Sequence, residues 1–207
     1  MVSVVSNGII NWQDEEPIKP EAPVGFLTAR SLRTDPDLAI STRADGLIST
    51  AEVMFRSAMS GSPVINLAER DAVLFSRAYQ DARVQRRQIS LEMALPAGYK
   101  LIDTRDRNFF SALARETGLQ RSMIVEFDLT KAMISGLGKN GNFRAELTMI
   151  VTVLDAQGRA IFRDSYSLSS DDTIRAAEGV YSESGLIGLF EPVIGDAYRK
   201  FLSQLNM

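Results

Sequence analysis

Two acidic side chains that alternate along a predicted strand are the first residues whose spacing could support chemistry. Glu126 and Asp128 lie two positions apart in the segment 122–129, and a strand would place both on one face. Carboxylate oxygens are the ligands that Mg²⁺ and Ca²⁺ prefer, but two of them are too few to enclose a calcium ion. The sequence therefore favours an exposed sheet face here over a divalent-ion site.

A second charged cluster, at 103–107, joins a predicted short strand (99–103) to a predicted helix (105–117). Strand-to-helix junctions hold the active sites of many parallel α/β proteins. Aspartate and threonine at such a place also cap the helix that follows, and Thr104 is the expected cap. Helix capping and surface ion pairing are the favoured interpretation of Asp103, Arg105, Asp106 and Arg107.

The segment 136–141, Gly-Leu-Gly-Lys-Asn-Gly, matches the glycine spacing of dinucleotide-binding loops. That loop binds pyrophosphate because a helix begins directly after it and points its amino terminus at the phosphates. Here the next residues form the clearest strand of the chain. A hairpin loop is therefore favoured over a nucleotide site.

The composition excludes several classes of chemistry. The 207 residues include neither cysteine nor histidine, which removes disulfides, thiol and Ser-His-Asp catalysis, and the usual ligands of zinc and haem. A net charge of −3 from 23 basic and 26 acidic residues argues against nucleic acid as the main ligand. No catalytic pattern outweighs its structural interpretation, so the sequence predicts a protein that is not an enzyme and needs no cofactor.

Four arginines gather at the end of a helix predicted over 67–88. Cations there complement the carbonyl end of the helix dipole, which is the favoured interpretation. A patch for an anion or a protein partner is the alternative. The four are Arg77, Arg83, Arg86 and Arg87.

A strongly amphipathic helix is predicted at the carboxy terminus, with Pro192 in its first turn or breaking it. Its apolar side could lie on a membrane or a partner, but Arg199 and Lys200 are its only basic residues. Packing on the protein's own sheet is therefore favoured. The residues of the apolar side include Ile187, Phe190, Ile194, Tyr198 and Phe201.

The candidate residues described so far must be positioned by the folded elements, and the clearest of these is a β-hairpin predicted over 143–166. Apolar residues recur at every second position from Phe143 to Val153, which places them on one face of a strand. Asp155 and Gly158 bound the predicted turn, because aspartate bonds its own backbone and glycine tolerates positive φ. The polar segment 167–185 is expected to be a loop.

The first half of the chain is predicted to hold an extended leader, a strand and a helix. Residues 1–25, with three prolines, are expected to form a leader or tether, and 26–207 a single domain. A strand is expected at 24–32, and a helix at 50–60 with a capping box at Ser49 and a stop at Gly61. No apolar run reaches eighteen residues, and the amino terminus lacks the basic region of a signal peptide. The chain is therefore expected to be either cytosolic or the mature part of an exported protein.

Three segments carry a resemblance to a known family. They are YKLIDTR at 99–105, ARETG at 114–118, and VTVLDAQGRAI at 151–161. The amino-acid sequences of these segments, and the order of elements over residues 45–205, resemble those of the curli-secretion lipoproteins and the related amino-terminal domain of TolB. The resemblance implies an α/β (α+β) fold with a single mixed sheet flanked by helices, and a periplasmic protein anchored by lipid to the outer membrane.

The chain departs from that family in two respects. The lipid-bearing cysteine is absent, which fits only if it was removed together with the export signal. The connections 131–142 and 167–185 are short or polar, so the long membrane hairpins of the pore-forming members are not expected.

The prediction is thus a non-catalytic envelope lipoprotein that binds a protein or envelope partner, or a membrane surface through its anchor. The alternative is a cytosolic small-molecule or anion-binding domain that uses the arginines of 77–87. A carboxylate enzyme with a divalent ion at Glu126 and Asp128 ranks last.

Overall fold

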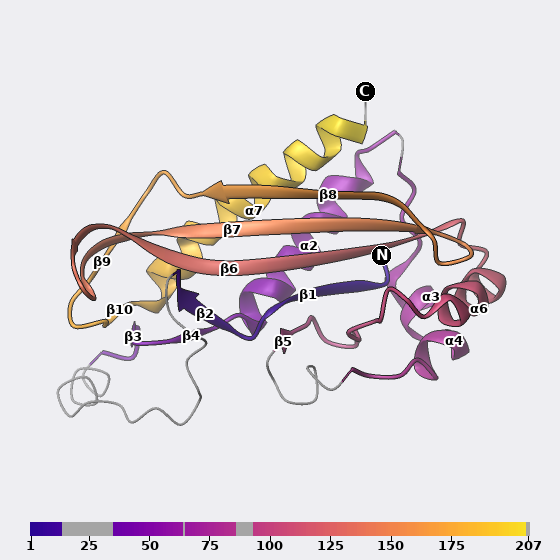
Figure 1. Ribbon diagram of the computed structural model, residues 1–207, viewed down its shortest axis with the longest axis horizontal. Helices are drawn as coiled ribbons and strands as arrows, with labels where there is room; N and C mark the ends of the chain where they lie inside the picture. The colour runs from indigo at the N-terminus through magenta and orange to yellow at the C-terminus, as the bar shows by residue number, and fades with distance from the viewer. Residues whose placement is uncertain (14–34, 64, 86–92, 206–207) are drawn as a thin grey trace.

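A long antiparallel meander forms the centre of the fold (Figure 1). The structure is a computed structural model that describes residues 1–13, 35–63, 65–85 and 93–205. Its strands are β1 (Ser3–Asn7), β2 (Ile9–Trp12), β3 (Leu38–Ala39), β4 (Thr42–Arg43), β5 (Met93–Ala94), β6 (Arg121–Leu137), β7 (Asn140–Asp155), β8 (Ala160–Ser169), β9 (Ile174–Ala176) and β10 (Tyr181–Ser182). Its helices are α2 (Asp45–Ser60), α3 (Arg70–Leu74), α4 (Arg77–Gln80), α6 (Arg107–Thr117) and α7 (Glu183–Leu205).

The sheet is mixed, which confirms the predicted α/β class with a mixed sheet flanked by helices. Strand β7 pairs antiparallel with β6 on one side and with β8 and β9 on the other. On the far side of β6, β1 and β2 both run parallel to it, with Ser3 opposite Ile124 and Asn11 opposite Thr130. The short strands β5 and β4 extend the sheet beyond β1 and β2, and β10 pairs separately with β3.

The prediction of an extended leader over 1–25 was wrong for its first half, because residues 3–12 form β1 and β2 inside the sheet. Val2, Val4 and Ile10 are fully buried. Residues of this β-branched type favour strands, and a tether would leave them in water. Residues 14–25 of that range and the strand predicted at 24–32 lie outside the described residues.

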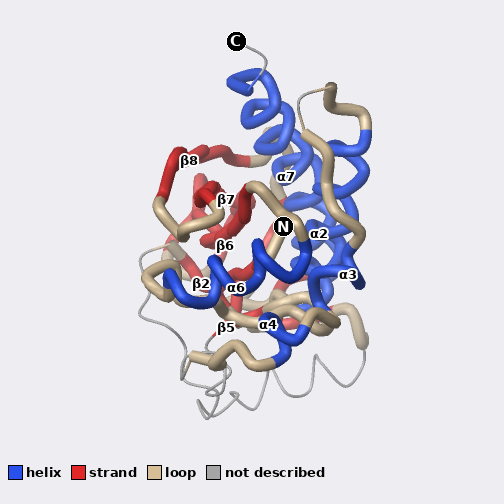
Figure 2. Tube along the Cα trace, turned by 90° about the vertical axis from the view of Figure 1, so that its right-hand side faces the viewer, coloured by secondary structure: helices blue, strands red, loops and turns tan. Residues whose placement is uncertain are grey.

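Two helices, α2 and α7, cover one face of the sheet, and Figure 2 shows them together on one side of the strands. The alternative of a membrane or partner face on α7 was wrong. Phe190, Ile194, Tyr198 and Phe201 are at most 1% exposed, and the half-buried Ile187 packs against the same core. In the part of the chain that the structure describes, no helix is long and apolar enough to cross a lipid bilayer.

Helix α7 continues through Pro192, where a break or a start was expected. Proline within a helix costs roughly 3 kcal/mol. Phe190 and Ile194 stand on either side of it and are buried against the core, and burying two such side chains stabilises the helix by about the same amount or more. Packing therefore outweighs the local penalty.

The predicted hairpin is confirmed, with Gly158 in its turn at φ 72°, but the strands extend further than expected. Segment 131–142, expected as a connection, continues β6 and β7 into a second turn. Gly136 and Gly141 face each other there, and a Cβ on Gly136 would lie 2.0 Å from the carbonyl oxygen of Asn140. The glycine-rich motif is thus a hairpin tip, as the sequence favoured over a nucleotide loop.

The helix predicted over 67–88 was wrong. The chain forms two short helices, α3 and α4, because Ser76 leaves the helical conformation and caps α4 by accepting a hydrogen bond from the Tyr79 N–H (3.3 Å). The Nζ of Lys100 then closes the other end of α4 by donating to the carbonyls of Tyr79 and Gln80. The four arginines were expected to complement the carbonyl end of one long helix. Because the segment forms two short helices, that explanation of the arginines does not hold.

Two other helices begin at residues that differ from those expected. Helix α2 starts at Asp45, and Ser49 donates to the Asp45 carbonyl instead of forming a capping box, while the stop at Gly61 is confirmed. Segment 99–103 is not a strand, and the cap of α6 is Asp106, which accepts from the Phe109 N–H (3.0 Å), in place of Thr104. The predicted stop of this helix at Gly118 is confirmed, at φ 72°.

Candidate functional site: the open face of the sheet

Strands β6, β7 and β8 have one face against the helices and one face turned away from them, which Figure 1 presents to the viewer. Because side chains alternate along a strand, the pattern that buries Phe127, Leu147 and Met149 turns their neighbours outward. We call the outward surface the open face. Its residues, in rows across the strands, are Glu126, Ile150 and Ser165; Asp128, Thr148 and Ser167; Thr130, Glu146 and Ser169; and Arg144.

One end of this face is covered. Thr152 and Leu154 follow on the same side of β7 but are at most 3% exposed. Helix α6 approaches the turn after β7, since a Cβ on Gly158 would lie 3.0 Å from the Phe110 ring. The exposed part of the face therefore begins at the row of Glu126.

A hollow of about 400 Å³ lies on the open face, lined by side chains of Gln13, Asp128, Thr130, Arg144, Glu146, Thr148, Ser167 and Ser169, among others. The Thr148 and Ser167 hydroxyls share a hydrogen bond of 3.0 Å across β7 and β8. Arg144 holds Glu146 through Nη2 at 2.8 Å. Besides Leu147 and Leu168, the lining carries hydroxyls, carboxylates, an amide and a guanidinium, which can exchange hydrogen bonds with a polar ligand.

Glu126 and Asp128 lie two positions apart on the same face of β6, and Asp128 lines this hollow. Asp128 is exposed, as the sequence favoured, and Glu126 is half-buried. No hydrogen bond or ion pair engages either carboxylate among the described residues. Within the same part of the chain, acidic side chains do not assemble into a group of three that could hold a metal ion.

The predicted arginine patch is not brought together by the described residues. Arg77 is on α4, where it pairs with Asp81 at 3.4 Å and is 90% exposed. Arg83 lies past the end of that helix and lines a separate hollow of about 340 Å³ with Arg105. Arg86 and Arg87 lie outside the described residues.

The charged junction at 103–107 pairs with itself, as the sequence favoured. Arg105 donates through Nε and Nη2 to the two carboxylate oxygens of Asp103, at 3.0 and 2.9 Å. These bonds hold the pKa of Asp103 below its ordinary value. With Asp106 engaged as the helix cap, the acidic groups of this second hollow already have partners.

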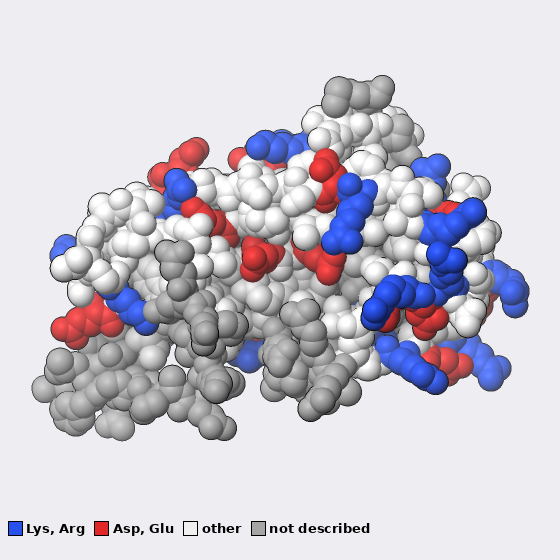
Figure 3. Space-filling view, viewed as in Figure 1, with Lys and Arg blue, Asp and Glu red and all other residues white. Residues whose placement is uncertain are grey.

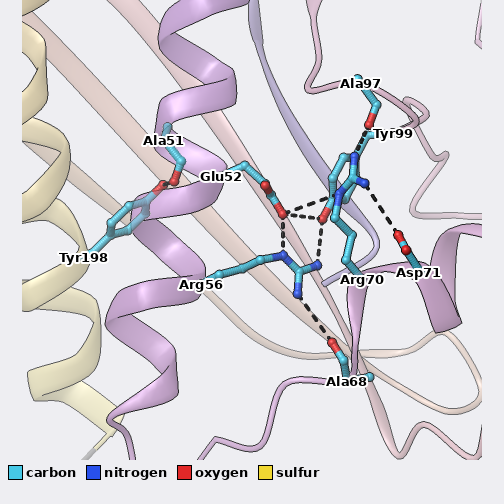
Figure 4. Close-up of polar contacts among 9 residues, drawn as sticks. All are labelled: Ala51, Glu52, Arg56, Ala68, Arg70, Asp71, Ala97, Tyr99 and Tyr198. Carbon is cyan, nitrogen blue, oxygen red and sulfur yellow. Dashed lines mark hydrogen bonds and ion pairs between the residues drawn. The ribbon is translucent and has the colours of Figure 1, made fainter.

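A buried polar cluster on the other side of the molecule was missed by sequence reasoning (Figure 4). Glu52 is 6% exposed and accepts hydrogen bonds from Arg56 Nε and from the Tyr99 hydroxyl (2.9 Å). Arg56 also donates to that hydroxyl (3.0 Å), and Arg70 Nε lies 3.9 Å from Glu52. The available signal was the helical spacing, because Glu52 stands between Ile48 and Phe55 on the buried side of α2.

Every member of this cluster has a partner, and besides the Glu52–Arg56 pair within α2 the partners come from separate segments. Arg70 donates to the Ala97 carbonyl, and its guanidinium lies 5.4 Å from the centre of the Tyr99 ring. Burial, opposed by Arg56, raises the pKa of Tyr99, so its hydroxyl keeps its proton. The Glu52 cluster thus ties α2 to the segments around 70 and 97, and its chemistry is structural.

The amino terminus lies within reach of the same charges. Burial, with a smaller contribution from the positive charge of Arg56, lowers the pKa of the Met1 amino group to about 5, and Glu52 opposes this shift. In protein whose first residue is Met1, this amine is therefore neutral near pH 7 when the chain is folded. Its burial follows from the position of β1 inside the sheet.

Comparisons with known proteins add little to this geometry. No protein-family model matches the sequence, and no curated protein matches it either. A solved structure from Caulobacter crescentus, described provisionally as a lipoprotein, aligns with 49% of this chain and 77% of its own, at 16% identity and a TM-score of 0.29. A similarity this low carries no argument about function, and nothing specific to the curli-secretion family was found.

Proposed function

We propose that this protein is a non-catalytic binding protein of the bacterial envelope, held there by a lipid anchor, and that the open face binds another envelope component. The observation that carries the proposal is the exposed polar hollow on β6, β7 and β8. The opposite face of the same strands is filled by α2 and α7, so within the described residues the open face is the one that these helices leave to a partner (Figure 1).

The kind of contact follows from the groups on this face. An antiparallel sheet commonly leaves one face in water, so exposure alone would not indicate binding. The hollow is an additional feature, and so are the two carboxylates, Glu126 and Asp128, which have no partner among the described residues. The lining carries no aromatic side chain among the described residues, and aromatic anchors dominate tight protein interfaces. This favours a polar, reversible contact.

A binding role is favoured over catalysis by the arrangement of the charged groups. The guanidinium of Arg144 is engaged by Glu146. Glu126 and Asp128 contact no other titratable side chain that could act with them as an acid, a base or a nucleophile, within the described residues. This arrangement supports recognition of a ligand over transfer of a proton.

The envelope location rests on the three segments that resemble the curli-secretion lipoproteins. It is tested by expressing the protein from its native gene in its own host, separating the cell fractions, and measuring the intact mass of the amino terminus. A lipid-modified terminus in the membrane fraction is expected. An unmodified protein in the cytosol would contradict the proposal.

The binding role is tested by photocrosslinking in the same cells. A photoreactive residue is placed at Ser167, which is exposed on the open face, and at Val53, which is 63% exposed on α2, as the matched control. A discrete crosslinked product is expected from position 167 and not from position 53. Equal products from both positions, or none from 167, would contradict binding at the open face.

A further inference from the structure

Strand β8 forms a long edge of the sheet. It is ten residues long and pairs with β7 on one side, and no other described strand pairs with it. The short strands β4, β5 and β9 hold only two or three residues each. An edge strand presents a row of backbone N–H and C=O groups that have no partner strand, which is a template for pairing with another chain.

The backbone groups of β8 alternate between those bonded to β7 and those turned away from it. In an antiparallel pair, both backbone groups of every second residue point toward the same neighbour. The Ser165 N–H donates to the side chain of Asp164, at 2.8 Å from Oδ1, so it faces away from β7. The even-numbered Ser170, directly after β8, donates its N–H to the Ala145 carbonyl of β7 at 2.9 Å. The groups at the free edge therefore belong to the odd-numbered residues Arg163, Ser165 and Ser167.

The last turns of α7 lie against β8 and extend past it. The Phe201 ring contacts the rings of Phe162 and Tyr166 on β8, with centroids 6.0 and 6.3 Å apart. Figure 1 and Figure 2 both show the end of α7 continuing beyond β8. Leu205 follows Phe201 by one turn on the same side of the helix and is half-buried. A strand added to β8 would therefore lie over the end of α7 and bury apolar surface there.

The edge itself carries little charge. Arg163 and Asp164 are the only charged residues of β8, and they have opposite signs. Figure 3 shows basic side chains gathered mainly at the end of the molecule that holds α4 and α6. The edge is thus suited to pairing through the backbone more than to an ionic contact. In the protein alone the Asp164 carboxylate satisfies the Ser165 N–H, and the carbonyl of an added strand can replace it.

We infer that β8 is a strand-addition site, which binds an extended segment of a partner protein antiparallel to it. This goes beyond the proposed function, because it concerns the edge of the sheet and not the open face. Antiparallel pairing is the more stable arrangement per residue. Residues of the segment opposite Arg163, Ser165 and Ser167 turn their N–H groups to β8 and their side chains to the open face. The alternate residues face α7 and are expected to be apolar.

The projecting end of α7 disfavours a second copy of this chain as the occupant. Two β8 strands paired about a two-fold axis would place both α7 helices on the same face of the joined sheet. The end of each helix would then approach the α7 of the other copy. A single extended segment has no helix of its own at that place and meets no such obstacle.

The first test adds a blocked peptide of alternating threonine and valine to the whole purified protein. Amide hydrogen exchange is followed by nuclear magnetic resonance. In the free protein, the amides of Arg163, Ser165 and Ser167 should exchange much faster than those of Phe162 and Tyr166. Peptide at about ten times its dissociation constant should slow the three odd-numbered amides about tenfold. Equal protection of both sets in the free protein, or slowing centred elsewhere, would overturn the inference.

Methylation of the peptide nitrogens tests the backbone pairing directly and leaves the protein unaltered. Methyl groups on the threonine nitrogens, which face β8, remove the donors and should abolish binding. Methyl groups on the valine nitrogens face away from β8 and should leave binding unchanged. The reverse result would overturn the antiparallel arrangement, and equal binding by both methylated peptides would overturn strand addition.

On the protein side, Ser165→Pro removes the outward N–H and should weaken peptide binding about tenfold, through the loss of one or two hydrogen bonds. Ser165→Ala keeps the N–H and is the matched control. Protection of the Phe162 and Tyr166 amides shows whether the strand is still folded. Unchanged binding by a folded Ser165→Pro protein would contradict the inference. A dimer in sedimentation that this variant dissociates would also overturn it, in favour of a second copy.

These outcomes are separate from those of the proposed function. Failure of the peptide to bind β8, with the cellular crosslink from position 167 intact, would overturn strand addition and leave binding at the open face supported. Peptide binding at β8 without that crosslink would support strand addition and contradict the proposed function.

Discussion

The Glu52 cluster and the open face are built from similar residues, carboxylates, arginines and hydroxyls, and they differ in how those groups are satisfied. In the cluster, one buried carboxylate contacts Arg56, Arg70 and the Tyr99 hydroxyl, and each of these groups has a hydrogen-bond or ion-pair partner (Figure 4). On the open face, Glu126 and Asp128 have no hydrogen-bond or ion-pair partner among the described residues. A satisfied network stabilises the fold, whereas unsatisfied groups on a fixed framework remain available for a ligand.

The difference arises from the elements that carry the charges. Glu52 lies on the inner side of a helix, where only full pairing makes burial of a carboxylate tolerable. Glu126 and Asp128 lie on a strand that is held by neighbours on both sides, so their side chains can stay unpaired without cost to the backbone. Substitutions should therefore separate the two regions by their effect on stability.

The largest expected effect is a rise in stability between pH 5 and pH 8 for protein whose first residue is Met1. The amine has its pKa at about 5 in the folded protein and at the ordinary value of 8.0 when the chain is unfolded, so the unfolded chain binds more protons in this window. The free energy of unfolding should then increase with pH, by on the order of 4 kcal/mol over three pH units. Urea titrations at several pH values measure it.

This pH effect is unusually isolated, because the chain has no histidine that would titrate in the same window. Acetylation of the Met1 amine removes the titrating group and is the control, so the slope should vanish whatever the absolute stability. A flat pH profile in the unacetylated protein would show that the amine is not buried next to the Glu52 cluster.

Next in size is the variant Glu52→Gln, which should destabilise the protein by about 3 kcal/mol. It leaves the guanidinium of Arg56 facing a neutral group in a largely buried site, and breaking such a pair costs several kcal/mol. Partial exposure of Arg56 keeps the expected loss at the lower end of that range. Urea unfolding measures the change, and a loss below about 1 kcal/mol would contradict a structural role for the cluster.

A smaller effect of opposite sign is expected from Thr152→Val at the covered end of the open face. The Thr152 hydroxyl is buried and has no hydrogen-bond partner among the described residues. Valine keeps the shape, suits a strand and removes the unsatisfied group, so stability should rise by about 1 kcal/mol. Val153→Ala, on the other face of the same strand, is the control and should destabilise. A loss of stability in Thr152→Val would show that the hydroxyl has a partner.

The smallest effect on stability is expected from Glu126→Gln and Asp128→Asn, within about 0.5 kcal/mol of the parent protein. Removal of mutual repulsion makes a slight gain the expected sign. The same substitutions should have the largest effect on partner binding. A destabilisation comparable with that of Glu52→Gln, measured by the same urea titration, would erase the distinction between the two regions.

Sequence reasoning succeeded where one local pattern decides the outcome. Alternation over 143–153 predicted strand β7, and Gly118 and Gly158 marked turns that their φ of 72° confirms. It failed where packing competes with local preference. The helix through Pro192 depends on packing against the core, and the short helix that follows the break at Ser76 is closed by Lys100, twenty residues further along the chain.

The candidate site was foreseen in part. The sequence placed Glu126 and Asp128 on a common strand face, and the structure agrees. The hollow beside them could not be foreseen, because it requires Gln13 after β2 and Ser167 on β8 to meet the same face. The Glu52 cluster was missed because its partners are far away along the chain, at Arg70 and Tyr99.

By itself, the sequence determined the central hairpin and excluded thiol and histidine chemistry, since these follow from periodicity and residue types. The class of fold was expected from the order of the elements and from the family resemblance. Only the tertiary structure decided which carboxylates have hydrogen-bond or ion-pair partners. Burial forces Glu52 to pair, while Glu126 and Asp128 lie on the face that α2 and α7 leave uncovered. Pairing depends on which segments meet in space, and a one-dimensional pattern does not contain that information.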